Sequence, residues 1–335
     1  MNGGQVPNTL RVECIAEDIR RVHDENDLAE QLVHADTHQI PATIVGGGSN
    51  LVLRNRLPGV AILLELCGTA FERLGDDDWR IVAAAGENWQ TVVDGALQRG
   101  IGGLENLTLI PGSAGAAPVQ NIGAYGRELS EFLESVTVFD RQEQCYSTLT
   151  GPQCGFGYRD SVFKRDAPNR YVITRLALRL GGAALAADYP DVASELADHR
   201  GTVDRKTVAG AVAKVRRRKL PDPARIGNVG SFFKNPMVTE AELDAVRALV
   251  DIDDYPAPAG TEGRKIPAAR LIDAAGWKGV RKDRVQVWPR QPLVLVNLGG
   301  ATGGEVLALA TGIRDDVYRK YGVALELEPV VLGTD

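Results

Sequence analysis

A glycine-rich segment is the first group of residues whose types and spacing could do chemistry. The sequence IVGGGSNLVLRN occupies residues 44–55, and its three consecutive glycines follow an apolar stretch typical of a strand. Glycine tolerates positive φ angles and lets backbone N–H groups gather around an anion such as a phosphate. The apolar LVL after Asn50 indicates another strand, which disfavours a Rossmann GxGxxG site followed by a helix. A tight glycine turn between paired strands is the alternative interpretation.

A long uncharged segment, Asn106–Gly126, is the second such group. Its sequence, NLTLIPGSAGAAPVQNIGAYG, contains two prolines, four glycines and several amides, so it cannot be a membrane-spanning helix. The glycines would let the backbone approach a flat or phosphorylated group, and Ser113, Gln120 and Asn121 could bind its polar edge. This composition suits a neutral ring system such as an isoalloxazine. A structural loop packed between domains explains the spacing equally well.

Charged and metal-binding side chains form the third group. The basic segment KVRRRK (214–219) suits a diphosphate, and it is also typical of a solvated helix end. His34 and His38 are four residues apart on an expected helix, but no HExxH motif or third ligand accompanies them, so we expect no metal site. Four cysteines without a CxxC pair indicate reduced thiols and a cytoplasmic protein.

The elements that must position these residues belong to an ordinary globular chain. It has 335 residues, 44% of them hydrophobic and 24% charged, and a net charge of −6. That charge argues against nucleic acid or an anionic membrane surface as the main partner, and the length suggests about two domains. The N-terminus lacks the apolar core of a secretory signal.

Hydrophobic periodicity and capping signals predict mixed helices and strands. A capping box of Thr239 and Glu242 starts one helix, and Asn88 is the expected N-cap of another. In the last helix, Asp315 is expected to pair with Arg319. Strands are expected at 42–47, 61–66, 79–86, 135–140, 171–180 and 323–333, and helices at 27–39, 89–100, 191–200, 203–220, 267–276 and 303–322.

Several motifs occur in an order that resembles a known family. They are GGGSNLVL, GLENLTLIPGSAGAAPVQNIGAYG, YRDSVFK, KLPDPARIGNVGSFFKNP, RLIDAAGWKG and GVALELEP. Together they resemble the UDP-N-acetylenolpyruvoylglucosamine reductases, flavoenzymes that make UDP-N-acetylmuramate for peptidoglycan synthesis in the cell wall. The resemblance extends from about residue 40 to the C-terminus. The YPAPAG stretch (255–260) is similar to the longer of the family's two variants.

The resemblance implies an α+β fold of the FAD-binding vanillyl-alcohol-oxidase type, with a third α+β domain that caps the substrate. The implied divisions are residues 1–68 with 321–335 and residues 69–219 for FAD binding, and residues 220–320 for substrate binding. FAD is the implied cofactor and NADPH the reductant. A cytoplasmic monomer is expected, with no nucleic-acid or membrane partner.

The resemblance also implies a reaction and three catalytic residues. A hydride passes from N5 of the reduced flavin to the vinyl carbon of UDP-N-acetylglucosamine enolpyruvate, and Ser231 gives a proton to the adjacent carbon. Arg159 matches the arginine that faces the substrate carboxylate. Glu328 matches the catalytic carboxylate, although strand alternation alone does not distinguish it from Glu326.

The remaining implied residues bind the cofactor or the substrate. Those matched to the cofactor are Gly46, Gly47, Gly48, Ser49, Asn50, Leu51, Pro111, Gly112, Ser113, Asn121, Ile122, Gly123, Ala124 and Tyr125. Those matched to the substrate are Tyr158, Tyr189, Arg216, Lys219, Asn235, Tyr255 and Gln291. The segment 280–290 just before Gln291 departs from the family pattern.

Two other functions remain open. One is a flavin oxidase of the same fold that acts on another alcohol or a lactone. The other is a non-catalytic UDP-sugar-binding protein, against which the presence of Arg159, Ser231 and Glu328 counts.

Overall fold

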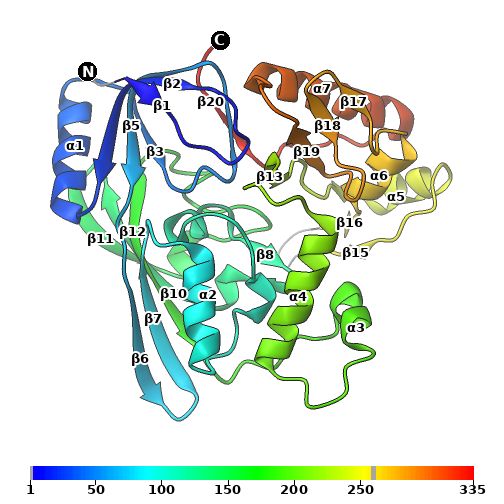
Figure 1. Cartoon of the computed structure of the whole chain (residues 1–335), viewed down its shortest axis with the longest axis horizontal. Helices are drawn as coiled ribbons and strands as arrows, with labels where there is room; N and C mark the ends of the chain where they lie inside the picture. The colour runs from blue at the N-terminus through cyan, green and yellow to red at the C-terminus, as the bar shows by residue number, and fades with distance from the viewer. Residues whose placement is uncertain (1–2, 258–261) are drawn as a thin grey trace. The chain divides into compact units, whose positions relative to one another are not determined.

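The computed structural model describes residues 3–257 and 262–335, which divide into two compact units (Figure 1). Unit 1 contains Glu17–Gly47 and Gly59–Arg218. Unit 2 contains Gly4–Ala16, Gly48–Pro58 and Lys219–Asp335. Both mix helices with strands, as expected. In the described residues, no helix combines the length and the apolar character needed to cross a membrane.

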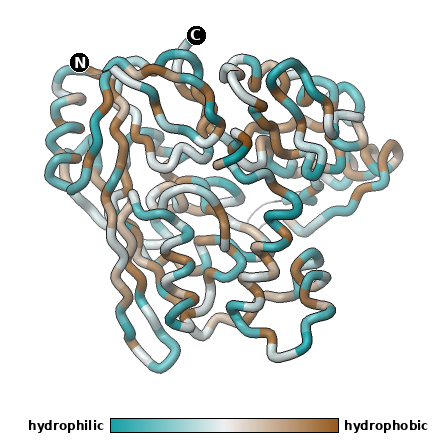
Figure 2. Tube along the Cα trace, viewed as in Figure 1, coloured by the Kyte–Doolittle hydropathy of each residue, from teal (hydrophilic) through white to brown (hydrophobic). Residues whose placement is uncertain are grey.

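An antiparallel sheet with strand order β11-β10-β12-β7-β6 forms the centre of unit 1. Alternating apolar residues on β12 are buried, and Leu176 pairs with Val136 of β10. Figure 2 shows brown, apolar stretches along this sheet and a teal, polar turn between β6 and β7. The strands are β6 (Thr69–Gly75), β7 (Asp78–Ala84), β10 (Leu133–Asp140), β11 (Cys145–Thr150) and β12 (Tyr171–Leu180).

Helix α2 (Trp89–Gln98) packs against this sheet and fixes the region before the uncharged segment. The Asn88 side chain accepts hydrogen bonds from the N–H groups of Gln90 and Thr91, which confirms the predicted N-cap. Trp89 is buried, and its indole N–H donates to the carbonyl of Leu107 at 3.0 Å. The helix thereby holds the start of the uncharged segment against the core.

A second sheet, with order β1-β2-β5-β3, carries the glycine run at the end of one strand. Strands β3 and β5 pair in parallel, with Ile44 opposite Ile62, and α1 buries Leu28 and Leu32 against them. Strand β3 stops at Val45, so Gly46 and Gly47 follow directly. The elements are β1 (Gly4–Gln5), β2 (Ile15–Val22), α1 (Glu25–Thr37), β3 (Ala42–Val45) and β5 (Arg56–Leu64).

The uncharged segment is an ordered, largely buried loop, which was one of its two predicted forms. It is built from short turns and a two-residue hairpin rather than a long helix. Helices α3 (Pro190–Leu196) and α4 (Arg205–Lys219) follow it in unit 1 and pack through Val192, Val208 and Val212. The turns and strands are η1 (Glu105–Leu107), η2 (Ala114–Ala116), η3 (Pro118–Gln120), β8 (Gly123–Ala124), β9 (Arg127–Glu128), η4 (Leu129–Glu131) and, further along, η5 (Pro152–Cys154).

Unit 2 is built on a four-stranded antiparallel sheet and a three-stranded one. Their orders are β13-β19-β18-β17 and β14-β16-β15, and β4 pairs in parallel with β20 near the C-terminus. The strands are β4 (Leu51–Leu53), β13 (Gly227–Ser231), β14 (Met237–Val238), β15 (Tyr255–Pro256), β16 (Arg264–Lys265), β17 (Arg281–Lys282), β18 (Val285–Val287), β19 (Val294–Asn297) and β20 (Val330–Leu332). The helices are α5 (Glu240–Arg247), α6 (Ala268–Ala274) and α7 (Gly303–Tyr321).

The last helix and the last strand of unit 2 differ from expectation. The predicted pair of Asp315 with Arg319 is wrong, because Arg319 binds Asp316 instead. Asp316 lies on the packed side of α7, where its carboxylate also accepts a hydrogen bond from the Trp277 indole at 2.9 Å. The expected strand over 323–333 is shorter, since only Val330–Leu332 forms a ladder.

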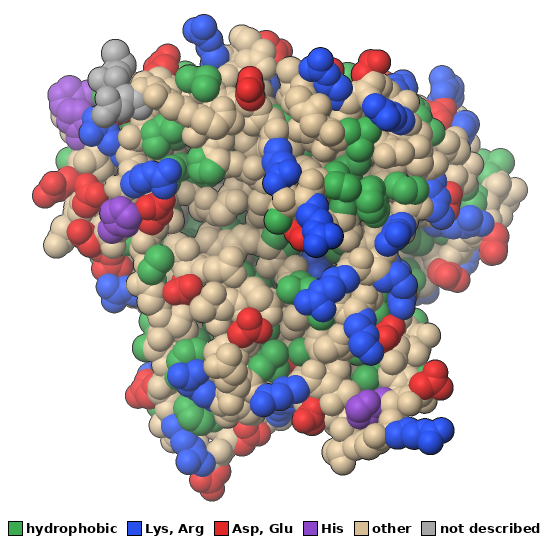
Figure 3. Space-filling model, viewed as in Figure 1, with side chains coloured by type: hydrophobic (Ala, Val, Ile, Leu, Met, Phe, Trp, Pro, Cys, Tyr) green, Lys and Arg blue, Asp and Glu red, His purple; other side chains and the backbone are tan. Residues whose placement is uncertain are grey.

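Charged residues of both signs cover the surface. On the face drawn in Figure 3, Lys and Arg side chains are interspersed with Asp and Glu. Several of them pair across strands, such as Arg80 with Glu134 on neighbouring parts of the unit 1 sheet. The modest net charge therefore describes a mixed surface rather than one strongly charged face.

Candidate active site

Two segments predicted to bind FAD meet in unit 1. A Cβ atom built on Gly46 would lie 2.4 Å from Ser113 Oγ, and one built on Gly47 would lie 3.0 Å from Gly112 Cα. These distances leave no room for a side chain at either glycine. The carbonyl of Gly112 also accepts a hydrogen bond from Trp89 N at 3.1 Å. Glycine is therefore required where the glycine run meets the uncharged segment.

The rest of the predicted glycine-run site lies in unit 2. Gly48 has φ +60°, and a Cβ built there would lie 2.5 Å from the carbonyl oxygen of Pro7. Its own carbonyl accepts a hydrogen bond from Thr9 N at 3.1 Å. Ser49 and Asn50 follow, and then Leu51 opens β4 and pairs with Val330. The strand expected after Asn50 is thus confirmed.

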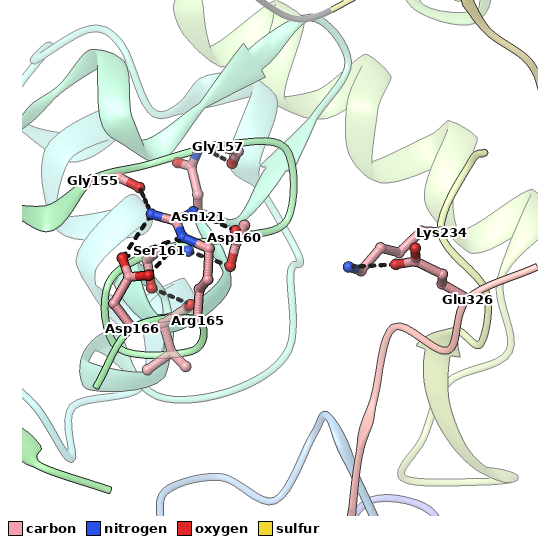
Figure 4. A network of polar contacts seen from close by, with 10 residues as sticks. Asn121, Gly155, Gly157, Asp160, Ser161, Arg165, Asp166, Lys234 and Glu326 are labelled. Carbon is pink, nitrogen blue, oxygen red and sulfur yellow. Dashed lines mark hydrogen bonds and ion pairs between the residues drawn. The ribbon is translucent and has the colours of Figure 1, made fainter. Parts of the chain in front are cut away.

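Asn121 uses its side chain to hold neighbouring loops. It has φ +45° and is 1% exposed. Its amide nitrogen donates to Glu128 Oε2 at 2.8 Å and to the carbonyl of Gly157 at 3.2 Å, and its Oδ1 accepts from Ser130 N at 2.9 Å. Figure 4 shows this side chain beside Gly157. Its backbone is bonded as well, because Asn121 N donates to the carbonyl of Pro118 at 3.3 Å and its carbonyl accepts from Arg159 at 3.4 Å.

Arg159 lies in a tight turn docked on the uncharged segment. Gly157 and Asp160 exchange two backbone hydrogen bonds, of 3.0 and 3.3 Å, around Tyr158 and Arg159. Arg159 takes φ +54°, a conformation that costs a non-glycine residue about 1 kcal/mol or more. Its guanidinium donates to the carbonyl of Gly123 at 2.7 Å and lies 5.4 Å from the centre of the Tyr158 ring.

Neighbouring residues support this strained turn. Asp160 pairs with Arg165 at 2.5 Å, and Arg165 also pairs with Asp166 at 2.9 Å (Figure 4). Ser161 is fully buried and donates its hydroxyl to the carbonyl of Val119. These contacts fix the YRDS segment against the loop that contains Asn121, which places the Arg159 guanidinium beside the predicted flavin-binding backbone.

A second cation, Arg216, lies near Arg159 and bonds to Tyr125. Burial lowers the pKa of Arg216, and the charge of Arg159 acts in the same direction, whereas the Tyr125 hydroxyl opposes both. Burial likewise raises the pKa of Tyr125, which therefore stays a neutral phenol at pH 7. The Tyr189 ring meets Tyr125 edge-on, with centroids 5.3 Å apart. Two guanidinium groups in partly desolvated surroundings favour an anionic ligand.

The predicted catalytic residues of unit 2 lie on adjacent backbone segments. Ser231 ends β13 and pairs with Val294. Immediately after it, the carbonyl of Phe232 accepts a hydrogen bond from Glu328 N at 3.1 Å, and Phe233 forms a bridge with Leu327. The segment that begins at Ser231 thus runs antiparallel to the one that contains Glu328.

The two glutamates that sequence alternation could not separate have different surroundings. The Glu326 side chain is 73% exposed, and its carboxylate pairs with Lys234 at 3.1 Å (Figure 4). Glu328 is only partly exposed. Glu326 therefore has the features of a surface ion pair, while Glu328 is the less exposed of the two.

The other predicted substrate residues of unit 2 are spread over several elements. The side-chain oxygen of Asn235 accepts a hydrogen bond from Ala268 N at 3.0 Å, so we expect any ligand contact to be made by its side-chain nitrogen. Lys219 accepts a hydrogen bond at its carbonyl from the Trp288 indole at 3.1 Å, an interaction that the sequence did not indicate. Gln291 lies in the turn before β19, and Tyr255 on β15 is 44% exposed. The rest of the YPAPAG stretch, 258–260, lies outside the described residues.

The structure thus groups the predicted residues by unit. Unit 1 brings Tyr125, Arg159, Tyr189 and Arg216 together, next to Gly123 of the predicted flavin-binding segment. Unit 2 brings the Ser231 and Glu328 segments together. Among residues 3–257 and 262–335, no group of three or more His, Cys, Asp or Glu side chains is arranged to hold a metal.

Comparison with family models defines the class of this protein. The model described as an FAD binding domain matches residues 17–148, and the model described as the C-terminal domain of UDP-N-acetylenolpyruvoylglucosamine reductase matches residues 222–332. The chain is an FAD-dependent flavoprotein with an α+β fold of the expected type. Both the predicted fold class and the predicted cofactor are confirmed.

Similar proteins identify the family. The chain is 42% identical to UDP-N-acetylenolpyruvoylglucosamine reductase of Burkholderia lata over 97% of this chain and 94% of that one, and 43% identical to that of Pseudomonas aeruginosa over 96% and 95%. The crystal structure of the reductase from Thermus caldophilus matches with a TM-score of 0.66 at 25% identity, covering 99% of this chain and all of that one. The chain belongs to the UDP-N-acetylenolpyruvoylglucosamine reductase family, which confirms the resemblance noted in the sequence.

Proposed function

We propose that this chain reduces the enolpyruvyl group of UDP-N-acetylglucosamine enolpyruvate to give UDP-N-acetylmuramate for peptidoglycan synthesis, with NADPH as the reductant. The observation that carries the proposal is the cationic group of Arg159 and Arg216 in unit 1, of which Arg159 donates to the carbonyl of Gly123 in the predicted flavin-binding segment. The substrate is an anion at both its carboxylate and its diphosphate. Family membership supports the same reaction.

The residues present fit FAD. The meeting of Gly46 and Gly47 with Gly112 and Ser113 forms a backbone cradle that a single added Cβ would fill. Backbone N–H groups in such a cradle suit a diphosphate, and the uncharged segment that follows Ser113 suits an isoalloxazine ring. FAD supplies hydride transfer when it is bound.

The cations of unit 1 are proposed to bind and orient the substrate anion. Arg159 is held by the carbonyl of Gly123 and by a strained turn, so its charge is fixed before substrate arrives. A fixed cation stabilises the negative charge that develops on the enolpyruvyl carboxylate more than a mobile one does. Arg216 and Tyr189 are proposed to contact the sugar nucleotide, and Tyr125, which bonds to Arg216, is proposed to contact the cofactor.

Ser231 and Glu328 are proposed to deliver the proton that the reduction requires. Ser231 gives the proton to the carbon adjacent to the one that accepts the hydride, because the family motif GSFFKNP assigns that role to this position. A serine hydroxyl is a weak acid in water, so solvent must be excluded when it acts. Glu328, which lies on the neighbouring segment, is proposed as the carboxylate that assists. Lys219, Asn235, Tyr255, Gln291 and Tyr158 are proposed as further substrate contacts.

The test of the proposed function separates the two half-reactions. In the Ser231→Ala variant, we expect NADPH to bleach the bound flavin at the normal rate. Reoxidation of the flavin by the enolpyruvyl substrate should slow by about 10²- to 10⁴-fold, the usual contribution of a positioned acid. Equal reoxidation rates in variant and parent would remove Ser231 from the mechanism.

The setting of the reaction is part of the proposal. We place the enzyme in the cytoplasm as a monomer, and we keep the three-part division into residues 1–68 with 321–335, 69–219 and 220–320. Sedimentation equilibrium of the full chain tests the monomer. Limited proteolysis near residues 219–220 tests the last boundary.

A further inference from the structure

Asn106 joins two segments that lie far apart in the sequence of unit 1. It lies in η1, is 1% exposed, and opens the uncharged segment. Its amide nitrogen donates to the carbonyl of Tyr125 at 2.8 Å and to the carbonyl of Ala186 at 3.0 Å. One carboxamide thus fixes the backbone of both the 121–126 loop and the stretch 181–188, which is called the tyrosine strap below because it leads into Tyr189.

Both segments present aromatic residues that interact. Tyr125 bonds through its hydroxyl to Arg216, and its ring meets the ring of Tyr189 edge-on, with an interplanar angle of 86°. Tyr125 also packs with Leu185 and Ala187 of the strap against the apolar cluster of α3 and α4. A shift of either backbone segment would therefore move Tyr189 relative to Tyr125 and Arg216.

Other side chains also bind the strap, and one of them is Asp77, whose carboxylate accepts a hydrogen bond from Gly182 N at 2.8 Å. Arg205 donates to the carbonyl of Ala183 at 3.2 Å and pairs with the buried Glu105 at 3.3 Å. Arg127 donates to the carbonyl of Ala184 at 2.6 Å and pairs with Glu131. Asn106 differs from them because its hydrogen bonds include Tyr125 as well as the strap.

The surroundings of the carboxamide oxygen indicate that the amide nitrogen determines how the Asn106 side chain is oriented. Asn106 Oδ1 is buried and has no hydrogen-bond partner among the described residues. A buried carbonyl without a partner destabilises the fold. The residue is thus oriented to use both donors of its nitrogen, at the expense of its oxygen.

We infer that Asn106 is a positioning residue for the sugar nucleotide, which it reaches through Tyr125 and Tyr189 rather than by direct contact. This inference rests on the proposed function, in which Tyr189 and Arg216 bind that substrate. The meeting point of Gly46 and Gly47 with Gly112 and Ser113 forms no part of this bridge, although Tyr125, whose backbone the bridge holds, is itself a predicted cofactor residue.

The test is steady-state and half-reaction kinetics of FAD-loaded Asn106→Ala. We expect KM for the enolpyruvyl sugar nucleotide to rise about tenfold, the effect of losing about one net hydrogen bond. With the FAD site saturated, we expect kcat and the rate of flavin reduction by NADPH to stay within about twofold of the parent. The matched control is Arg127→Met, which loosens the strap at Ala184 alone and should leave KM within twofold.

A double variant tests whether Asn106 acts through Tyr189. In a Tyr189→Ala background, adding Asn106→Ala should change KM by less than twofold. A full tenfold change in that background, or an equal KM rise in Arg127→Met, would show general loosening and overturn the inference.

The remaining outcomes are also decisive. If Asn106→Ala folds poorly, Asn106→Ser gives the same comparison with a smaller disturbance. Failure of excess FAD to restore flavin reduction by NADPH in both variants would show that the bridge serves the cofactor and would overturn the inference. If the parent enzyme turns over the substrate and Asn106→Ala has the same KM as the parent, the role of Asn106 is wrong while the proposed function stands. If the reduced parent enzyme is not reoxidised by the substrate, the proposed function itself is wrong.

Discussion

Replacing Gly47 with alanine tests the proposed cofactor cradle where its two backbone segments meet. The added Cβ would lie 3.0 Å from Gly112 Cα and 3.3 Å from both Gly112 C and Ser113 N. Carbon atoms prefer separations of about 3.5–4.0 Å, so the two backbones must part by roughly half an ångström. All three neighbours are backbone atoms, which cannot rotate away as a side chain can. Overpacking of this kind costs about 1–3 kcal/mol.

This cost should appear in FAD affinity. We expect this cost to fall mainly on the FAD-bound form, in which both loops are proposed to contact the cofactor, so Kd for FAD should rise about 5- to 150-fold. The assay is titration of the FAD-free protein with FAD, followed by flavin fluorescence. Gly210→Ala is the control, because no heavy atom lies within 4 Å of a Cβ at that helical position. Parent-like affinity in Gly47→Ala, with an unchanged melting temperature, would refute the assignment of this cradle to FAD.

Two further predictions concern single carboxylates. A hydrogen bond from Lys320 lowers the pKa of Asp316 from 3.8 to about 2, so its stabilisation is present above pH 4 and is lost as the pH falls toward 2. Asp316→Asn should therefore reduce the free energy of unfolding at pH 7 by about 2 kcal/mol, seen as a lower melting temperature, and by less at pH 3. Asp315→Asn is the control and should leave the melting temperature unchanged. A difference that does not depend on pH would contradict the ionic origin of the stabilisation. Glu328→Gln should slow flavin reoxidation by the substrate at least about 100-fold in a stopped-flow experiment. Glu326→Gln should slow it less than twofold. The opposite order of rates would assign the catalytic role to Glu326.

Local signals made much of the secondary structure predictable. Asn88 and Thr239 cap their helices as expected, because an N-cap depends on residues two or three positions away. The glycine run and the uncharged segment indicated backbone that approaches other groups closely. In the structure the backbone at Gly47 does approach the backbone of Gly112 and Ser113 closely.

Contacts between distant parts of the chain were not predictable in the same way. Asn106 binds Ala186, which lies 80 residues further on, and no local pattern specifies that contact. The choice of Asp316 over Asp315 depends on Trp277, a residue outside the helix. The alternation that treated Glu326 and Glu328 alike assumed a regular strand, but in the part of the chain that the structure describes this segment forms an isolated bridge, between Leu327 and Phe233, rather than a strand.

The most direct test of the central claim is an anaerobic mixing experiment. The enzyme is reduced with one equivalent of NADPH, separated from NADP, and mixed with UDP-N-acetylglucosamine enolpyruvate. We expect the yellow flavin colour to return with the formation of one UDP-N-acetylmuramate per flavin. A flavin that stays bleached until oxygen is admitted would contradict the reductase assignment and favour an oxidase of the same fold.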